Sequence, residues 1–154
     1  MKRDFYTQLV YARRLPLVGR GAYFILKLLG VEIPLSVTVG TDFLLEHGGF
    51  GTVVHSSTII KDRVKLYPGV TIGRADIYRP SEQSRFEGIV IEDEAVLCPG
   101  CKVLCKEGTL HVGRGTVIGA NAVLLESTGE GEIWAGIPAR RVGFREKAGA
   151  EIGR

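Results

Sequence analysis

Aliphatic residues recur every six positions along most of this chain, and this period restricts the possible folds more than any other feature. The interval is kept in four runs: Ile33, Val39 and Leu45; Val54, Ile60, Leu66 and Ile72; Ile91, Leu97 and Val103; Val112, Ile118 and Leu124. A second set of residues, each four places after one of these aliphatics, is also predicted to point inward: Val37, Phe43, Thr58, Val64, Val70, Ala95, Cys101, Thr116 and Ala122. A period of six fits neither the 3.6 of a helix nor the alternation of a long strand. It indicates short strands separated by tight corners.

Three six-residue faces would form one triangular coil, and stacked coils would share one continuous core. The sequence therefore predicts an all-β fold, a parallel β-helix of hexapeptide repeats over residues 31–142. A β-sandwich is the alternative, but its strands would show a period of two and irregular turns. Glycines directly after an inward aliphatic (Gly40, Gly73, Gly113, Gly119) are predicted to lie where the backbone bends sharply.

Interruptions of the repeat point to a binding surface, because loops that break a rigid repeat usually line one. Residues 48–53 add three positions directly after His47, and 74–90 is a longer excursion, predicted to be an extruded loop. A smaller slip lies at 106–110. Residues 1–30 are predicted to form a helical cap, broken near Leu15-Pro16, and 143–154 a C-terminal tail.

Charge is unevenly distributed along the chain. The net charge is +3; residues 1–30 hold six Lys and Arg against Asp4, a surplus of five, which leaves −2 for the remainder. No basic face for nucleic acid is indicated. The cap, amphipathic around 23–29, either covers the β-helix or associates peripherally with a membrane. Without a signal peptide or an apolar stretch long enough to span a bilayer, we expect a cytoplasmic protein, possibly at the inner face of the membrane.

Three cysteines within eight residues, Cys98, Cys101 and Cys105, form no disulfide framework, and a reducing compartment is expected. These thiols could form a zinc site with His111, and the alternative is that they are buried or surface thiols. Because Cys101 occupies an inward position and the other two fall on different parts of their faces, we expect no metal.

Three segments resemble the hexapeptide-repeat acetyltransferases, within them the serine acetyltransferases and their relatives that acetylate cell-surface polysaccharides. They are residues 31–33 with 45–49, residues 67–73, and residues 118–123 with 134–140, which end in Gly-Ile-Pro-Ala-Arg. The resemblance covers about 110 residues and implies a left-handed β-helix, a homotrimer and acetyl-CoA as acyl donor. Zinc carbonic anhydrases share the fold, but the close histidine pair of that family is missing here.

His47 matches the general base of the serine acetyltransferases, and Glu32 matches the acidic residue that orients it, although that branch has aspartate there. Asp42 and Glu46 are alternative orienters. A thioester is already activated, so the acceptor hydroxyl needs only a base, and histidine suits that role near neutral pH. A carboxylate at the other ring nitrogen would fix the tautomer. The alternative is that His47 is a structural corner residue.

Cofactor contacts are expected where the repeats end. Small residues would form a wall for the long acyl carrier, and cations would meet its phosphates. The predicted cofactor-binding residues are Gly119, Ala120, Ala135, Gly136, Arg140 and Arg141. Alternatively, Arg140 and Arg141 only make the C-terminal tail more soluble.

Two departures from the serine acetyltransferases favour a sugar of a surface polysaccharide, or its precursor, as the acceptor. The His-Pro pair that ends the loop in that family is replaced by Glu87-Gly88, and only about thirty residues precede the first repeat. Tyr78, Arg79 and Arg85 are the predicted acceptor-binding residues. Serine O-acetylation is the alternative reaction, and a non-catalytic scaffold or sugar-binding module the alternative class.

Overall fold

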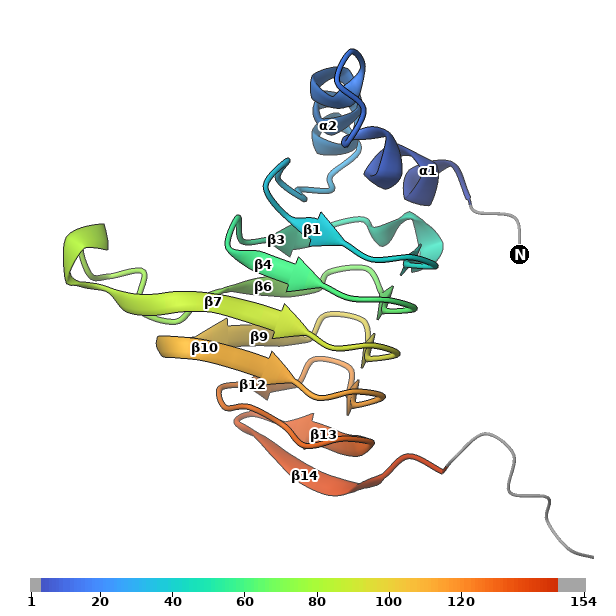
Figure 1. Ribbon diagram of the computed structural model, residues 1–154. Helices are drawn as coiled ribbons and strands as arrows, with labels where there is room; N and C mark the ends of the chain where they lie inside the picture. The colour runs from blue at the N-terminus through green and yellow to red at the C-terminus, as the bar shows by residue number, and fades with distance from the viewer. Residues whose placement is uncertain (1–3, 147–154) are drawn as a thin grey trace, which may run out of the picture.

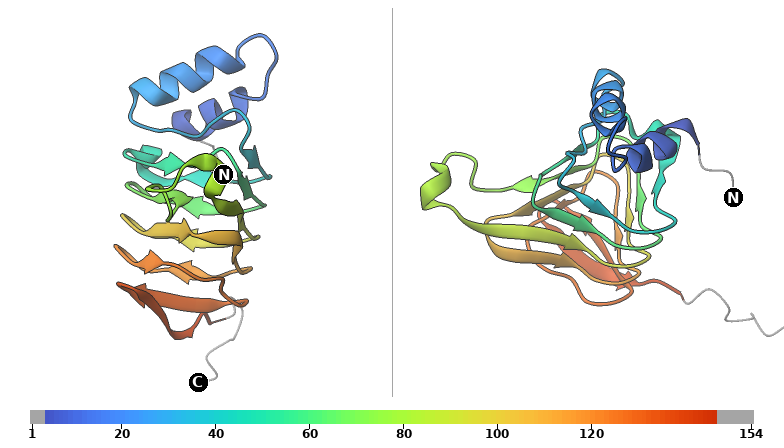
Figure 2. Two further views of the ribbon diagram at one scale, coloured as in Figure 1. Left: turned by 90° about the vertical axis from the view of Figure 1, so that its left-hand side faces the viewer. Right: turned by 45° about the horizontal axis from the view of Figure 1, so that its top comes forward.

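The computed structural model, which describes residues 4–146, is a triangular prism of stacked coils with two helices at one end (Figures 1 and 2). Three sheets form its faces. The first contains β1 (Thr38–Val39), β4 (Thr58–Ile60), β7 (Arg85–Ile91) and β10 (Glu107–Val112). The second contains β2 (Leu44–Leu45), β5 (Lys65–Leu66), β8 (Val96–Leu97), β11 (Val117–Ile118), β13 (Glu132–Gly136) and β14 (Ala139–Phe144). The third contains β3 (Val53–Val54), β6 (Thr71–Arg74), β9 (Lys102–Cys105) and β12 (Val123–Leu124).

The residues that recur every six positions are the residues that form the core. Every aliphatic residue of the four runs is buried, and so is every companion four places later. In-register parallel pairing stacks equivalent residues, as in Leu45↔Leu66 and Leu66↔Leu97, so the inward side chains form one continuous column. The predicted fold, a left-handed parallel β-helix with a short helical segment and an extruded loop, is confirmed.

At two of the three edges of the prism, the chain turns three residues after an inward aliphatic, where the backbone enters the left-handed region. Asp42, Arg63 and Glu94 do so at one edge, and Gly69 and Gly100 at another. None of the four glycines predicted at sharp bends, Gly40, Gly73, Gly113 and Gly119, has a positive φ, so no left-handed corner requires them. A Cβ at Gly40 would lie 2.5 Å from the Lys61 carbonyl carbon, so the requirement there is space between coils.

Three edges separate the faces, and each has its own side chains. The His47 edge joins the second sheet to the third through residues 46–52, 67–70, 98–101 and 119–122. The charged edge joins the first sheet to the second through residues 40–43, 61–64, 92–95 and 113–116. The loop edge joins the third sheet to the first through residues 55–57, 75–84 and 106, whereas residues 125–131 run from β12 of the third sheet to β13 of the second.

The extruded loop is shorter than predicted. Irregular chain, with a 3-10 turn η2 (Ser81–Gln83), occupies residues 75–84, whereas 85–90 belong to strand β7. β7 pairs with β10 from Arg85↔Glu107 onward, and the two project beyond the prism as a ribbon (Figure 1). The predicted slip at 106–110 is the start of β10, with a register shift between Gly108 and Thr109.

Helices α1 (Phe5–Ala12) and α2 (Gly19–Leu28) lie at the end of the prism nearest the N-terminus (Figure 1). Arg13 fastens them to the first coil: its buried guanidinium donates to the carbonyls of Val10, Ile33 and Pro34. Burial lowers the pKa of Arg13 to about 10. Neither helix is long and apolar enough to cross a membrane.

An antiparallel hairpin of β13 and β14 closes the other end. β14 reaches Phe144, two residues beyond the predicted end of the repeats. Residues 147–154 of the predicted tail, and 1–3 of the predicted cap, lie outside the described residues.

Candidate active site

His47 stands in a widened corner at the end of the His47 edge nearest the helices. Here a 3-10 turn η1 (Glu46–Gly49) accommodates the three extra residues. His47 has φ 51° and ψ 32°, a left-handed conformation that is uncommon for residues other than glycine. Gly48 and Gly49 also have positive φ, and Gly48 lies against the Tyr6 ring of α1. Three successive left-handed residues turn the chain outward and leave the imidazole exposed.

Tyr67 is the aromatic neighbour of His47 on the next coil. The two ring centroids are 6.0 Å apart with a tilt of 51°. Leu45 and Leu66 are register partners, so the residues that follow them, Glu46 and Tyr67, stack at the same corner. The imidazole therefore has one side against an aromatic ring and the other toward solvent.

Glu32 lies on the preceding coil, where it forms a parallel bridge with Val53. Its carboxylate is 3.0 Å from Lys27 Nζ and accepts a 3.5 Å hydrogen bond from Tyr23 Oη. Among residues 4–146, no hydrogen bond joins it to His47.

The alternative orienters are placed differently by the fold. Glu46 precedes His47 in the same turn, with its carboxylate 3.8 Å from Lys65 Nζ. Asp42 is a corner residue of the charged edge. Glu46 therefore lies within the His47 corner, whereas Glu32 lies beside Val53, at the start of the strand that follows this corner.

The predicted cofactor-binding residues lie farther along the same edge as His47. Leu45, Leu66, Leu97, Ile118 and Trp134 are aligned by strand pairing, so Gly119 and Ala135 continue the position of Glu46. Gly119 donates its N–H to the Trp134 carbonyl at 2.7 Å, and Ala120 is exposed. At about 4.8 Å between strands, the four steps from His47 to the Gly136 region span roughly 19 Å. Pro68, Pro99 and Ala120 give this edge a wall of compact side chains.

Arg140 and Arg141 are at the far end of that wall but have different surroundings. Arg140 pairs with Ala135 across the hairpin, is exposed, and lies 3.3 Å from Glu126. Arg141 donates to the buried Glu132 carboxylate at 2.9 Å. Burial alone would raise the pKa of Glu132, but hydrogen bonds from Trp134, the Gly129 amide and Arg141 lower it. Arg141 therefore has a buried partner, whereas the partner of Arg140, Glu126, is exposed.

The predicted acceptor-binding residues do not lie at the edge that holds His47: Tyr78 and Arg79 lie at the loop edge, and Arg85 begins strand β7. Tyr78 and Arg79 form a cation–π contact, 5.7 Å from guanidinium to ring centroid, in the exposed loop. Arg85 is 3.2 Å from Glu107 on the projecting ribbon. Within one chain, the fold does not bring these residues together with His47.

Asp76 fixes the base of the loop. Its carboxylate is fully buried and accepts hydrogen bonds from Arg74 Nε and Ser84 Oγ at 2.8 and 2.7 Å. These two donors hold the pKa of Asp76 below its ordinary value. The loop consequently leaves and rejoins the prism at a rigid base.

His55 is half-buried beside this loop base. Its ring meets Phe86 edge-on at 4.8 Å, and its Nδ1 accepts a hydrogen bond from the Ser57 amide. Burial, and then the charge of Arg74, lower its pKa. No spacing in the sequence signalled this contact, because Phe86 follows an irregular loop. His111 is in strand β10 with Nδ1 3.5 Å from Glu92.

All three cysteines are free thiols, and Cys101 and Cys105 are buried. Burial raises the pKa of Cys101 to about 12, so this thiol behaves as a core residue. Within residues 4–146, no group of three or more His, Cys, Asp and Glu side chains is arranged to hold a metal ion.

Taken together, the fold and the edge define a hexapeptide-repeat protein with an exposed histidine above a wall of compact residues. Searches of known sequences return serine acetyltransferases. That of Bacillus subtilis (strain 168) is 31% identical over 143 residues, covering 86% of this chain and 62% of the relative. That of Bacillus pumilus is 34% identical over 113 residues, covering 73% and 48%. No family model matches the chain.

Solved structures agree. A serine O-acetyltransferase from Brucella melitensis has a TM-score of 0.71 and 26% identity, covering 92% of this chain and 55% of that one. A serine acetyltransferase from Brucella abortus in complex with coenzyme A has a TM-score of 0.69 and 25% identity, covering 83% and 49%. The chain belongs to the hexapeptide-repeat, left-handed β-helix acetyltransferase family. It spans about half the length of the curated relatives it matches.

Proposed function

We propose that this protein is an acetyl-CoA-dependent O-acetyltransferase with His47 as its general base. The observation that carries the proposal is the alignment of His47, the compact wall and Arg140 along one edge. Acetyl-CoA would lie along this edge, with its phosphates near Arg140 and its thioester near His47. The coenzyme A complex of the Brucella abortus relative supports this choice of donor.

The reaction requires one proton carrier. The neutral His47 imidazole accepts the proton of the acceptor hydroxyl while its oxygen attacks the thioester carbonyl carbon. The C–S bond of the resulting tetrahedral species then breaks, and the departing thiolate takes the proton from the imidazolium. Tyr67 bounds one side of the ring, which limits the orientations of the imidazole. No covalent enzyme intermediate is needed.

Glu32 is proposed as the orienter of His47, and this role requires its carboxylate to exchange Lys27 for the imidazole. Glu46 is the competing candidate because it lies within the His47 corner. Comparing Glu32→Gln with Glu46→Gln separates the two: the variant of the true orienter lowers kcat and shifts the pH profile of kcat/KM, and the other leaves both unchanged.

Serine is the first acceptor to test. The relatives are named serine acetyltransferases, which favours serine over the polysaccharide sugar that the departures in sequence predicted. The replacement of His-Pro by Glu87-Gly88 remains the specific reason to include other small hydroxyl compounds.

A homotrimer is proposed because the site is incomplete in one chain. His47 lies at one edge of the prism, whereas Tyr78 and Arg79 lie at the loop edge and Arg85 at the start of β7. Rotation about a closed threefold axis could set the loop of one subunit beside the His47 edge of the next.

The deciding experiment is release of free thiol from acetyl-CoA by the purified full chain, with serine, free sugars and buffer alone as acceptors. Thiol release that depends on serine supports the proposal with serine as the acceptor. Thiol release that depends on a sugar supports the proposal with a polysaccharide sugar, or its precursor, as the acceptor. No release with any acceptor, from a folded protein, would favour a non-catalytic scaffold or sugar-binding module.

Assembly is tested by mixing two inactive variants, His47→Ala and Arg85→Ala, in refolded hetero-oligomers. A site shared between subunits regains activity in about a quarter of sites, because each contributing half is intact in half of the chains. Light scattering that shows a monomer at micromolar concentration would contradict the trimer.

A further inference from the structure

The outermost helix, α2, exposes a row of large apolar side chains together with the turn before it. Leu17, Leu28 and Phe24 are 97%, 73% and 61% exposed, and Ile25 is also exposed. We call Leu17, Phe24, Ile25 and Leu28 the α2 face. Exposed apolar residues are ordinary when scattered, but a contiguous group marks an interaction surface.

Helix geometry places the α2 face away from the protein core. Ala22 and Leu26 are buried. At about 100° per residue, Phe24 and Leu28 fall on the opposite side of the helix, and Arg20 and Lys27 share one flank of it. An apolar stripe bordered by cations is the pattern of helices that lie in the surface of a membrane.

The charge around this face has one sign. Between Phe5 and Val31 the sequence has four Lys and Arg residues and no Asp or Glu. Arg13 is buried against carbonyls and Lys27 is paired with Glu32, whereas Arg14 and Arg20 are exposed. The occupant of the face must therefore tolerate apolar contact and attract cations.

The position of α2 suits contact with a flat surface. α2 is the last element at its end of the prism, with α1 between much of it and the first coil (Figure 2). α1 is the main partner of α2, and the projecting ribbon of β7 and β10 extends sideways from the prism (Figure 1). A flat surface can consequently contact α2 without contacting the loop at residues 75–84.

We propose that the α2 face, with Arg14 and Arg20, docks this protein end-on to an anionic lipid surface. A second copy of the chain fits less well, because two such faces would bring like charges together. The proposal is independent of the acetyltransferase reaction, since α2 lies outside the His47 edge.

Vesicle flotation of the full chain tests the proposal, with phosphatidylglycerol–phosphatidylcholine vesicles compared with phosphatidylcholine alone. We expect binding to the anionic vesicles that weakens as salt is raised. Replacing Arg14 and Arg20 by Gln should reduce binding about fivefold per cation, about thirtyfold together. Phe24→Ser with Leu28→Ser should abolish detectable binding. The controls are Ile77→Ser for an exposed apolar residue and Lys106→Gln with Arg114→Gln for charge; both should bind like wild type.

Two outcomes would overturn the proposal. One is a wild-type chain that stays unbound to anionic vesicles at low salt. The other is an oligomer, measured by light scattering without lipid, that becomes smaller in the Phe24→Ser, Leu28→Ser variant while vesicle binding is unchanged. That second result would assign the face to contact between copies.

Discussion

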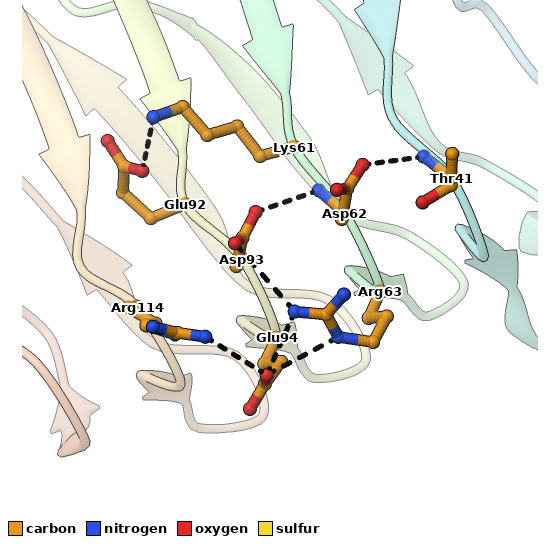
Figure 3. Close-up of polar contacts among 8 residues, drawn as sticks. All are labelled: Thr41, Lys61, Asp62, Arg63, Glu92, Asp93, Glu94 and Arg114. Atoms are coloured by element: carbon orange, nitrogen blue, oxygen red, sulfur yellow. Dashed lines mark hydrogen bonds and ion pairs between the residues drawn. The ribbon is translucent and has the colours of Figure 1, made fainter.

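The His47 edge and the charged edge of the prism have the same backbone but opposite side-chain chemistry. Both turn through left-handed residues three places after an inward aliphatic. At the charged edge these corners hold ion pairs between coils: Lys61 with Glu92, and Arg63 and Arg114 with Glu94 (Figure 3). At the His47 edge the corresponding positions are Pro68, Gly69, Pro99, Gly100, Ala120 and Asn121.

The difference shows how one repeat gives two kinds of surface. At the charged edge each ion is neutralised by a neighbour one coil away, and such exposed pairs contribute little stability each. At the His47 edge, prolines and glycines leave room, and one coil is widened to expose an imidazole. The same repeat therefore gives one edge lined by paired charges and another lined mostly by compact residues.

The largest effect should come from removing the imidazole. His47→Ala is expected to lower turnover by about two to four orders of magnitude, the usual contribution of a general base, without changing the fold. Thiol release and circular dichroism measure the two quantities. His111→Ala, at an exposed histidine of the first sheet, is the matched control and should keep its activity. Near-normal turnover in His47→Ala would make His47 a structural corner residue.

A bulky side chain on the surface of compact residues along the His47 edge should have the next largest effect. Ala120→Trp places a bulky ring on the proposed path of acetyl-CoA and should weaken its affinity by about tenfold or more, about 1.4 kcal/mol. Arg114→Trp places the same ring at the charged edge and should leave the affinity unaltered. Calorimetric titration with coenzyme A measures both. Equal affinities in the two variants would move the cofactor to another part of the molecule.

The two arginines at the end of the wall should behave differently. Arg140→Ala is expected to weaken cofactor binding about fivefold, and more at low salt, since an exposed cation is screened. Arg141→Ala removes a partner of the buried Glu132 carboxylate, so its main effect should be a lower melting temperature. Cofactor affinity measured across a salt series, beside thermal unfolding, separates the two. Salt-independent, unchanged affinity in Arg140→Ala would leave backbone contacts as the main recognition.

The smallest effect should be found at the charged edge. The Thr41 amide, 2.7 Å from Asp62 Oδ1, holds the pKa of Asp62 below 3.8. A depressed pKa stabilises the fold above the unfolded pKa, and this contribution is lost as pH falls through the folded pKa.

Asp62→Asn should therefore lower the melting temperature at pH 7 by no more than about 3 °C, and the difference should shrink below pH 3.8. Glu82→Gln, at an exposed carboxylate of the loop edge, should show neither effect. A difference between wild type and Asp62→Asn that grows in acid would contradict the assignment. Thermal unfolding between pH 7 and pH 3 measures it.

The sequence by itself determined the fold and its core. The six-residue period could be read without structure because each repeat contacts only its neighbours, so local spacing is also spatial order. The same argument located the widened corner at His47 and the wall at Gly119 and Ala120. The loop was placed correctly as an interruption, but its end was not, because β7 begins at Arg85 to pair with β10, a partner more than twenty residues away.

Only the tertiary structure decided which side chains meet. Spacing put Glu32 and His47 on adjacent coils, but the Glu32 carboxylate pairs with Lys27, which comes from a helix outside the repeat. Arg140 and Arg141 are neighbours in sequence, yet Arg140 pairs with the exposed Glu126 and Arg141 with the buried Glu132. The reason is that successive residues of a strand point to opposite faces. The loop and His47 lie at two different edges of the prism, because each coil has three sides. Repetition fixes the backbone, whereas contacts between non-repeating segments depend on how those segments pack.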